Sequence, residues 1–149
     1  ARLLVNAERV REVGEISGYA CKVSHLSGDG YALLGNAGEF LDPVFSSGVT
    51  IALKSASLAS KLVVRQLDGE TPDWQREFAE PLGRGIETFR AYVNGWYDGS
   101  LQRVIFGSPA DPGKVKAMIT SVLAGYAWDD ENPFVKQPVK YLTMLAELC

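Results

Sequence analysis

"GNAGEFLDPVFSSGV", residues 35–49, is the stretch that decides how this chain folds. Three glycines, an Asp-Pro pair and two serines interrupt the chain here, and a long run without glycine or proline follows. Because glycine has no Cβ, another group can come close to the backbone at such positions. The stretch therefore predicts a strand that turns into a helix, with something in close contact at the turn.

The residues on either side support a division into an extended and a helical part. Residues 17–34 alternate loosely and are broken by Ser27-Gly28-Asp29-Gly30, which predicts a hairpin with Gly28 and Gly30 in its turn. A helix is expected to begin near residues 46–48 and to end at Asp68-Gly69. Its expected buried face consists of apolar residues at three- and four-residue spacing, namely Val49, Ala52, Leu53, Ala56, Ala59, Leu62 and Val63.

Three further helix starts are each marked by a proline near a capping residue. They are Thr71-Pro72-Asp73, Asp111-Pro112 and Asn132-Pro133. Pro138 leaves the last start open, and Pro81, within an apolar stripe over residues 74–96, predicts either a kink or two shorter helices. We therefore expect a single α+β unit that is mainly helical, with a short β-hairpin or strands followed by four or five helices.

The composition argues against several classes of function. A net charge of −3 with scattered basic residues argues against a nucleic-acid partner. Two cysteines far apart and a single histidine supply neither a disulfide framework nor a metal site, which fits a cytoplasmic protein. Charged residues interrupt the most apolar segment, so no membrane span is expected. The chain also opens in the middle of a pattern and without Met, so we expect a fragment of a longer protein.

The physical chemistry of residues 35–49 favours an anion. Unpaired backbone N–H groups and the helix dipole both attract negative charge to a helix N-terminus. Gly48 would let a flat ring or an ion approach, Ser46 and Ser47 can cap or donate, and Asp42-Pro43 would fix the entry turn. Spacing alone also allows a simpler interpretation, in which the glycines only make a tight connection and Ser46 caps the helix.

The stretch resembles the second flavin-binding motif of the flavin-dependent halogenases and their monooxygenase relatives. That motif runs Gly-Asp-Ala-Ala-Gly-Phe-Leu-Asp-Pro, then Ser-Ser or Ser-Thr, then Gly, and residues 35–48 are similar to it. The resemblance implies the C-terminal portion of an α/β FAD-binding flavoprotein of the glutathione-reductase-like, hydroxylase type. Residues 1–50 would end the FAD-binding domain, and residues 51–149 would form a long helix and a C-terminal helical region.

The resemblance also implies roles for individual residues. The cofactor-binding positions are Gly35, Asn36, Asp42, Pro43, Gly48, Val49 and Thr50, and the halide-binding positions are Ser47 and Gly48. Members of the group use reduced FAD from a flavin reductase, O2 and, in the halogenases, chloride or bromide. Their halogen-directing lysine has no counterpart in these 149 residues, so no catalytic residue is assigned and the chain alone is expected to be inactive.

Two departures from the family pattern bear on the cofactor and the substrate. Asn36 replaces the usual Asp, which keeps a hydrogen-bonding side chain but loses the charge that anchors a ribityl hydroxyl. Phe45 stands where halogenases of free tryptophan carry a glutamate, whereas Val-Phe-Ser-Ser-Gly is typical of those acting on phenols or carrier-bound pyrroles. The expected activity of the full-length protein is therefore halogenation of an electron-rich phenol or pyrrole. An FAD-dependent monooxygenase or dehydrogenase without halide is the alternative, and a non-enzymatic helical interaction domain is a third interpretation.

Overall fold

The computed structural model describes residues 5–107 and 112–149. Its elements, in chain order, are β1 (Cys21–Lys22), β2 (Ser27–Gly28), β3 (Tyr31–Ala32), η2 (Gly35–Ala37), β4 (Glu39–Phe40), η3 (Pro43–Phe45), α1 (Gly48–Leu67), η4 (Gln75–Ala79), α2 (Glu80–Tyr97), α3 (Ser100–Phe106), α4 (Pro112–Leu123), α5 (Pro133–Lys136) and α6 (Pro138–Leu148). The expectation of a mainly helical chain with a few short strands is confirmed. The described residues form six α-helices rather than four or five, because α3 was not anticipated and Pro138 separates α5 from α6.

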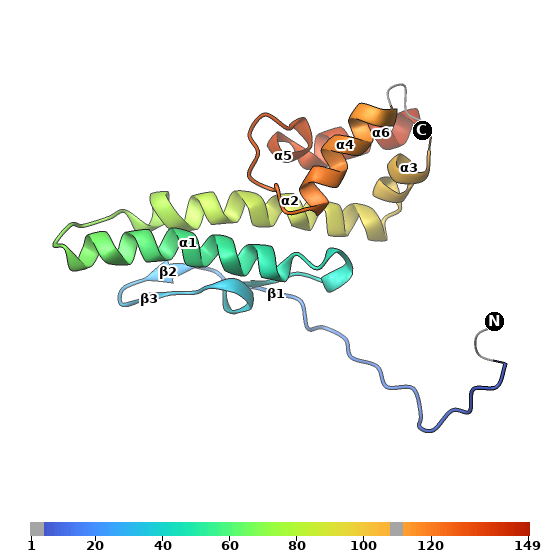
Figure 1. Ribbon diagram of the computed structural model, residues 1–149, viewed down its shortest axis with the longest axis horizontal. Coiled ribbons are helices and arrows are strands. Elements are labelled where there is room, and N and C mark those ends of the chain that lie inside the picture. Colours follow the sequence, from blue (N-terminus) through green and yellow to red (C-terminus); the bar gives the residue numbers. More distant parts are fainter. Residues whose placement is uncertain (1–4, 108–111) are drawn as a thin grey trace.

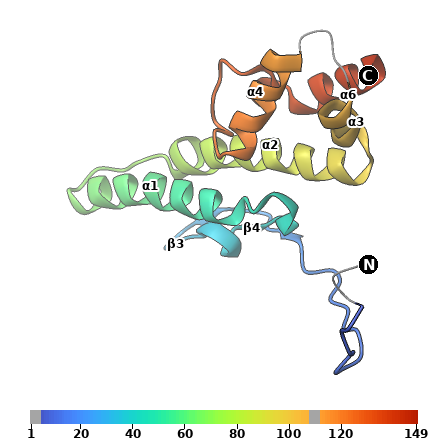
Figure 2. The ribbon, with the colours of Figure 1, turned by 45° about the vertical axis from the view of Figure 1, so that its right-hand side comes forward.

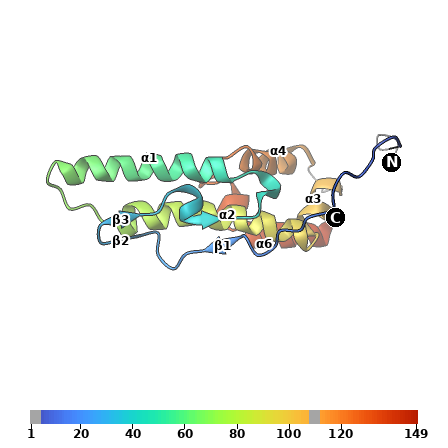
Figure 3. The same ribbon diagram turned by 90° about the horizontal axis from the view of Figure 1, so that it is seen from below.

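These elements form three layers (Figures 1 and 2). The long helices α1 and α2 run side by side and antiparallel, and α3 to α6 cover one side of α2. The strands and η2 lie on the other side, next to both long helices when seen from below (Figure 3). β1 pairs with β4 and β2 pairs with β3, both antiparallel. The stretch that decides the fold therefore runs from the strand layer, through η2 and β4, into the start of α1.

The predicted hairpin is present, but its glycines have different roles. Gly30 has a φ of +74°, as a turn glycine requires. Gly28 is instead a residue of β2, paired with Tyr31. A Cβ on Gly28 would lie 2.5 Å from Cε1 of Tyr31, so this glycine makes room for the tyrosine ring. The expectation that Gly28 is a turn residue was therefore wrong.

Helix α1 begins and ends as predicted, but only Ala59 and Leu62 of its expected face are buried. Gly48 starts it, Asp68 closes it, and Gly69 follows with a φ of +90°. Its buried residues are Ile51, Ser55, Ala59 and Leu62. Val49 and Leu53, which were expected to be buried, are 71% and 68% exposed. Periodicity found only part of the face because α1 carries apolar residues on both sides, and its packing against η2 and α2 selects one.

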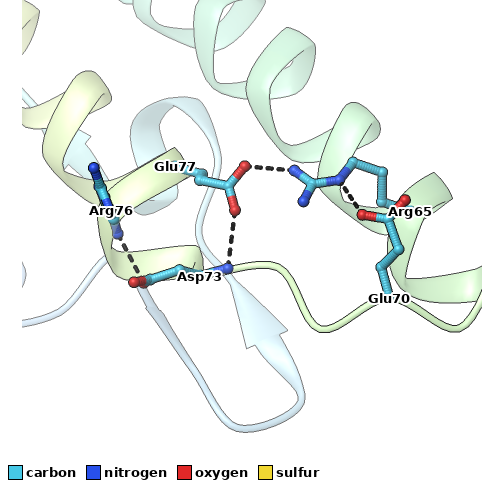
Figure 4. Close-up of polar contacts among 5 residues, drawn as sticks. All are labelled: Arg65, Glu70, Asp73, Arg76 and Glu77. Atoms are coloured by element: carbon cyan, nitrogen blue, oxygen red, sulfur yellow. Dashed lines mark hydrogen bonds and ion pairs between the residues drawn. The ribbon is translucent and has the colours of Figure 1, made fainter.

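The N-terminal turn that leads into α2 is capped by Asp73 rather than by Thr71. The Asp73 carboxylate accepts a hydrogen bond from the Arg76 N–H at 3.0 Å. Glu77 in turn accepts one from the Asp73 N–H at 3.0 Å, as Figure 4 shows. Thr71 and Pro72 lie before the helix, so the predicted cap was wrong by two residues. Asp73 caps better because its carboxylate can reach the unpaired N–H groups of the first turn.

Arg65 closes the connection between α1 and α2. Its guanidinium pairs with Glu70 of the connecting loop at 2.7 Å and also with Glu77 (Figure 4). The hydrogen bond from Arg65 lowers the pKa of Glu77. Trp74 adds a contact between the same two elements, because its indole N–H donates to the Gln66 side chain at 3.0 Å. The two long helices are thus held together at this end by polar contacts.

Pro81 changes the winding of its helix without ending it. Residues 75–79 form the π-helical turn η4, which continues directly into α2. The Glu80 N–H donates to the Gln75 carbonyl, five residues back. Because Pro81 has no N–H and its ring crowds the preceding turn, a wider turn is one way to keep the helix continuous. The alternative of two separate helices was wrong.

The last predicted starts are partly confirmed. Asn132 caps α5, since its side chain accepts a hydrogen bond from the Phe134 N–H. A separate helix, α6, begins at Pro138, the residue that had left this start open. Asp111 lies outside the described residues, and α4 begins at the adjacent Pro112.

The core lies between α2 and the helices around it. Its largest fully buried side chains include Phe78, Phe89, Tyr92 and Phe134. Trp128 lies so close to α2 that a Cβ on Gly85 would be 2.0 Å from its ring. Its indole N–H donates to the Pro81 carbonyl at 2.8 Å. Aromatic packing therefore stabilises the helical layers.

Candidate functional site

An open groove of about 600 Å³ lies over the N-terminus of α1. It is lined by Leu34, Gly35, Asn36, Phe40, Leu41, Pro43, Ser46, Gly48, Val49 and Ala52. Five of the seven positions expected to bind the cofactor are among these residues. The groove has the size of a small-molecule site. Its lining combines apolar side chains with the backbone of two glycines, Gly35 and Gly48.

Asn36 and Gly48, from opposite ends of the motif, meet in this groove. A Cβ on Gly48 would lie 3.2 Å from Oδ1 of Asn36 and would have no other close neighbour within the described structure. Gly48 is the first residue of α1 and does not have a positive φ. Backbone conformation therefore does not require glycine here, and the tight neighbour of a Cβ would be the Asn36 side chain.

Gly35 and Gly38, by contrast, are explained by the protein itself. Gly35 has a φ of +53°, and a Cβ there would lie 3.1 Å from that of Ala52. A Cβ on Gly38 would lie 2.9 Å from Leu26 and 3.0 Å from the Leu33 carbonyl. The simpler interpretation, a tight connection, thus holds for two glycines of the stretch and does not account for Gly48.

Ser55 holds the start of the stretch against α1. This serine is completely buried, and its Oγ accepts a hydrogen bond from the Gly35 N–H at 3.0 Å. The same hydroxyl donates to the Ala52 carbonyl at 2.8 Å. A buried N–H without a partner is costly, so this bond fixes the left-handed turn at Gly35 on the helix surface.

The Asp42 carboxylate accepts hydrogen bonds from other residues of the protein. Oδ1 accepts from the Val44 N–H at 3.2 Å and caps η3, while Oδ2 accepts from the Tyr19 hydroxyl at 3.1 Å. Hydrogen bonding to Asp42 raises the pKa of Tyr19 and of Tyr97. Asp42 therefore shapes the entry to the groove, and its neighbour Pro43 lines the groove itself.

The junction between η3 and α1 leaves the first turn of the helix open. Ser46 has a φ of 54°, a left-handed conformation that is uncommon for a residue other than glycine. Ser47 holds the N-cap position but makes no capping hydrogen bond with its side chain, and it is only 4% exposed. Ser46 is thus not the cap that the simpler interpretation assigned. The first turn of α1 therefore lacks a side-chain cap, and an uncapped helix N-terminus is an arrangement that favours anions.

Thr50 and Phe45 point away from the groove. A Cβ on Gly125 would lie 3.3 Å from the Thr50 hydroxyl, so the Thr50 side chain faces the turn after α4. The ring of Phe45 packs edge-on against Trp96 at 5.7 Å. Of the positions expected to bind the cofactor, Thr50 can therefore contribute only its backbone at this groove.

Three residues that make polar contacts next to the groove were missed by sequence analysis. They are Ser55, which binds Gly35, and Glu39 and Arg90, which form an ion pair at 2.9 Å between the stretch and α2. The sequence signal that could have identified two of them is a polar residue among apolar neighbours. Ser55 lies among the small residues of α1, and Arg90 directly follows Phe89. No residue spacing links Glu39 to Arg90, because they belong to elements far apart in the chain.

The described part of the chain offers no competing metal centre. No group of three or more His, Cys, Asp or Glu side chains within it could hold a metal ion. None of its helices has both the length and the apolar character needed to cross a membrane. Cys21 and Cys149 are free and exposed.

Comparisons with known proteins show relatives among flavin enzymes. No protein-family model matches the chain. A 1H-pyrrole-2-carbonyl peptidyl-carrier protein chlorinase from Pseudomonas fluorescens is 43% identical over 95 residues, which is 61% of this chain and 21% of that protein. A brominase of the same substrate from Pseudoalteromonas luteoviolacea is 34% identical over 77 residues, 52% of this chain and 18% of that protein. The chain thus spans about a fifth of the length of these curated relatives.

A solved structure matches more of the chain. It is a flavoprotein/dehydrogenase from Cytophaga hutchinsonii, with 52% sequence identity and a TM-score of 0.82. The match covers 88% of this chain and 32% of that one. The resemblance inferred from residues 35–49 is therefore confirmed, and this chain is a relative of the flavin-dependent halogenases and of a flavoprotein dehydrogenase.

Proposed function

We propose that this chain is the C-terminal part of an FAD-dependent oxidoreductase of the halogenase-like group and that FAD lies along the groove over α1. The observation that carries the proposal is the convergence of Asn36 and Gly48 on a helix N-terminus without a side-chain cap. FAD, when bound, supplies the redox chemistry. The protein's part is to bind and orient it.

The groove fits the chemistry of a flavin. Its apolar residues Leu34, Phe40 and Ala52 suit a flat ring, and the bare backbone at Gly48 lets that ring come close. The dipole and the N–H groups of α1 stabilise negative charge, which both the diphosphate and a reduced flavin carry. Asn36 keeps a hydrogen-bonding side chain for the ribityl chain, without the charge of the usual Asp.

A halide would bind at Ser47 and Gly48. The support is the same uncapped helix start, because a small anion there would be held by backbone N–H groups. Ser47 is buried, so an ion at this point would be partly removed from water. This niche can serve a halogenase, but it does not require that a halide occupy it.

The exposed face of α1 supports a longer protein. Val49, Leu53 and Leu67 are 71%, 68% and 81% exposed, although each is a large apolar residue on one long helix. Such a stripe is typical of a helix that packs against a further layer. We assign residues 1–50 to the end of an FAD-binding domain and residues 51–149 to the long helix and C-terminal helical region, with the rest of that domain covering this stripe.

The proposed substrate is an electron-rich aromatic ring of phenol or pyrrole type, free or bound to a carrier protein. Phe45 in place of glutamate and the pyrrole-carrier relatives support it. A flavin reductase in the cytoplasm would supply reduced FAD to the full-length enzyme.

A second candidate is an FAD-dependent dehydrogenase or monooxygenase that uses no halide. The specific observation in its favour is the Cytophaga hutchinsonii flavoprotein/dehydrogenase, which is more similar and covers more of this chain than the two halogenases. Both candidates share the flavin site. A helical interaction domain without enzymatic activity is the third alternative, in which the exposed apolar stripe binds a protein partner.

The flavin site is tested by titrating the full-length protein with FAD and comparing Gly48→Val with Gly113→Val. Both glycines lie in the first turn of a helix, but a Cβ on Gly113 meets nothing within 4 Å. We expect Gly48→Val to abolish FAD binding while the helical circular dichroism is kept, and Gly113→Val to bind normally. Unchanged affinity in Gly48→Val would contradict the placement, and a wild-type protein that takes up no FAD would favour the interaction domain.

The reaction is tested with a flavin reductase, chloride or bromide, and a panel of phenols, indoles and pyrroles. Product mass distinguishes the candidates, because halogenation replaces hydrogen by chlorine or bromine while monooxygenation adds oxygen. Halogenated products support the halogenase. Oxidised products without halogen, under the same conditions, assign the protein to the second candidate.

A further inference from the structure

Four charged side chains link β1, β4 and α2 next to the proposed flavin site. Glu39 of β4 is only 4% exposed, and its Oε1 lies 2.9 Å from Nη2 of Arg90 in α2. Arg90 Nε also donates to Glu87 at 3.2 Å, and Glu87 accepts from Lys22 of β1 at 3.1 Å. We call Lys22, Glu39, Glu87 and Arg90 the Glu39 charge cluster.

The cluster forms a chain of alternating charge from Lys22 through Glu87 and Arg90 to Glu39. Lys22 and Glu39 are directly opposite each other in the β1–β4 pair, and Glu87 and Arg90 are one turn apart on α2. Burial alone would raise the pKa of Glu87, but the hydrogen bond from Lys22 and the charge of Arg90 outweigh it and lower the pKa. The cluster therefore joins the strand layer to α2 through two ion pairs, Lys22–Glu87 and Glu39–Arg90.

Because the Glu39 carboxylate is buried, it depends on Arg90 to compensate its charge. Glu39 Oε1 and Arg90 Nη2 are both buried and have no aligned hydrogen-bond partner within the described structure, so their ion-pair contact is what compensates them. Removing the two charged groups from water costs about as much free energy as their mutual attraction provides. A buried ion pair therefore adds little net stability. In some proteins a buried polar or ionic pair instead fixes the relative position of the elements that carry it.

Glu39 is placed where position matters for the groove. β4 lies between η2, which carries Asn36, and η3, which begins at Pro43. The residues that follow Glu39, Phe40 and Leu41, line the groove. A shift of β4 would therefore change the distance between the Asn36 side and the Gly48 side of the site.

We infer that Glu39 and Arg90 are positioning residues that hold the two halves of the flavin groove in register, with Glu87 and Lys22 orienting Arg90. This inference rests on the proposed flavin site. Nothing in the motif resemblance assigns these residues a role, since Glu39 stands where the family pattern has glycine. The cluster contacts no ligand itself and acts through the backbone of residues 35–48.

The test compares Arg90→Met with Arg84→Met in the full-length protein. Arg84 lies on the same helix, but its contact to Asp130 is 3.9 Å long and both side chains are about two-thirds exposed. We expect Arg90→Met to speed amide hydrogen exchange over residues 35–48 by about tenfold or more, to weaken FAD affinity similarly, and to shift the visible absorption of bound flavin. Arg84→Met should change none of these.

Two further variants separate positioning from stability. Arg90→Lys keeps the charge without the guanidinium fork and should give intermediate exchange, affinity and flavin spectrum. The double variant Glu39→Leu with Arg90→Met removes both charges, so it should recover thermal stability but not FAD affinity or the spectrum. These variants keep the test valid if Arg90→Met fails to fold.

Two results would overturn the inference. One is unchanged exchange over residues 35–48 together with unchanged FAD affinity in a folded Arg90→Met. The other is a double variant that recovers affinity and spectrum along with stability. Failure of the wild-type protein to bind FAD would instead overturn the proposed function, because the exchange measurement needs no cofactor.

Discussion

The strand layer and the helical layers of this molecule are held together by different means. Residues 17–48 are attached to the long helices through the Gly35–Ser55 hydrogen bond and the Glu39–Arg90 ion pair. The helical layers are held by buried aromatic rings such as Phe78, Phe89 and Phe134. The comparison shows that large buried rings dominate the helical region, while the strand region combines a smaller apolar contact, through Leu41 and Phe45, with a few directional polar contacts.

The largest effect on stability should come from disrupting the contact between Gly85 and Trp128 in the helical layers. In Gly85→Ala the new methyl group would overlap the Trp128 ring, whose displacement also breaks the indole bond to Pro81. We expect the free energy of unfolding to fall by about 3 kcal/mol. Chemical denaturation followed by tryptophan fluorescence measures this.

Gly83→Ala is the matched control, because a Cβ there meets nothing within 4 Å on the same helix. It should raise the free energy of unfolding by about 0.5–1 kcal/mol, as expected for alanine in a helix. Equal stability changes in the two variants would show that the Trp128 contact does not restrain the helical layers.

A smaller effect on stability should come from removing the Ser55 hydroxyl, which binds the strand layer to α1. Ser55→Ala leaves the buried Gly35 N–H without its acceptor, at a cost of about 1–3 kcal/mol. We expect faster hydrogen exchange at the Gly35 amide and little change within α2. Ser60→Ala, on the exposed side of α1, removes only a hydrogen bond to the Ser57 carbonyl. It should change neither the stability nor the hydrogen exchange at Gly35. Uniform acceleration across both regions would mean that they do not open separately.

The smallest effect concerns the Arg65 contacts that join the two long helices. Because the pKa of Glu77 is lowered below its ordinary value of 4.5, Glu77 contributes stability above that pH and loses it as the pH falls further. Glu77→Gln should therefore be less stable than wild type at pH 7, and the difference should shrink below about pH 4.5. Thermal denaturation from pH 3 to 7 measures it, and a difference independent of pH would refute the role of the ionised carboxylate.

Most local features were predictable because their signals are local. The ends of α1 follow from Gly48 and from Asp68-Gly69, the hairpin from Asp29-Gly30, and the α5 cap from Asn132. The cap at Asp73 was missed by two residues because Thr71-Pro72 is itself a good start pattern. The π-helical turn before Pro81 was missed because proline predicts a disturbance but not how the backbone absorbs it.

The candidate site was predictable as a segment but not as a geometry. The motif identified residues 35–49, and five of the expected positions do line one groove. That the Thr50 side chain faces Gly125 follows from the turn after α4, which lies far along the chain. The involvement of Ser55 and Arg90 likewise depends on how the layers pack.

The sequence by itself determined the kinds of element, their order and the likeness to flavin enzymes, because turn glycines, caps and periodicity act over a few residues. Only the tertiary structure decided which face of α1 is buried and which of its glycines the protein itself explains. It also brought Glu39 to Arg90, which no spacing along the chain indicates. The physical reason is that burial and ion pairing depend on which elements meet, and an amphipathic pattern with two apolar sides does not specify that.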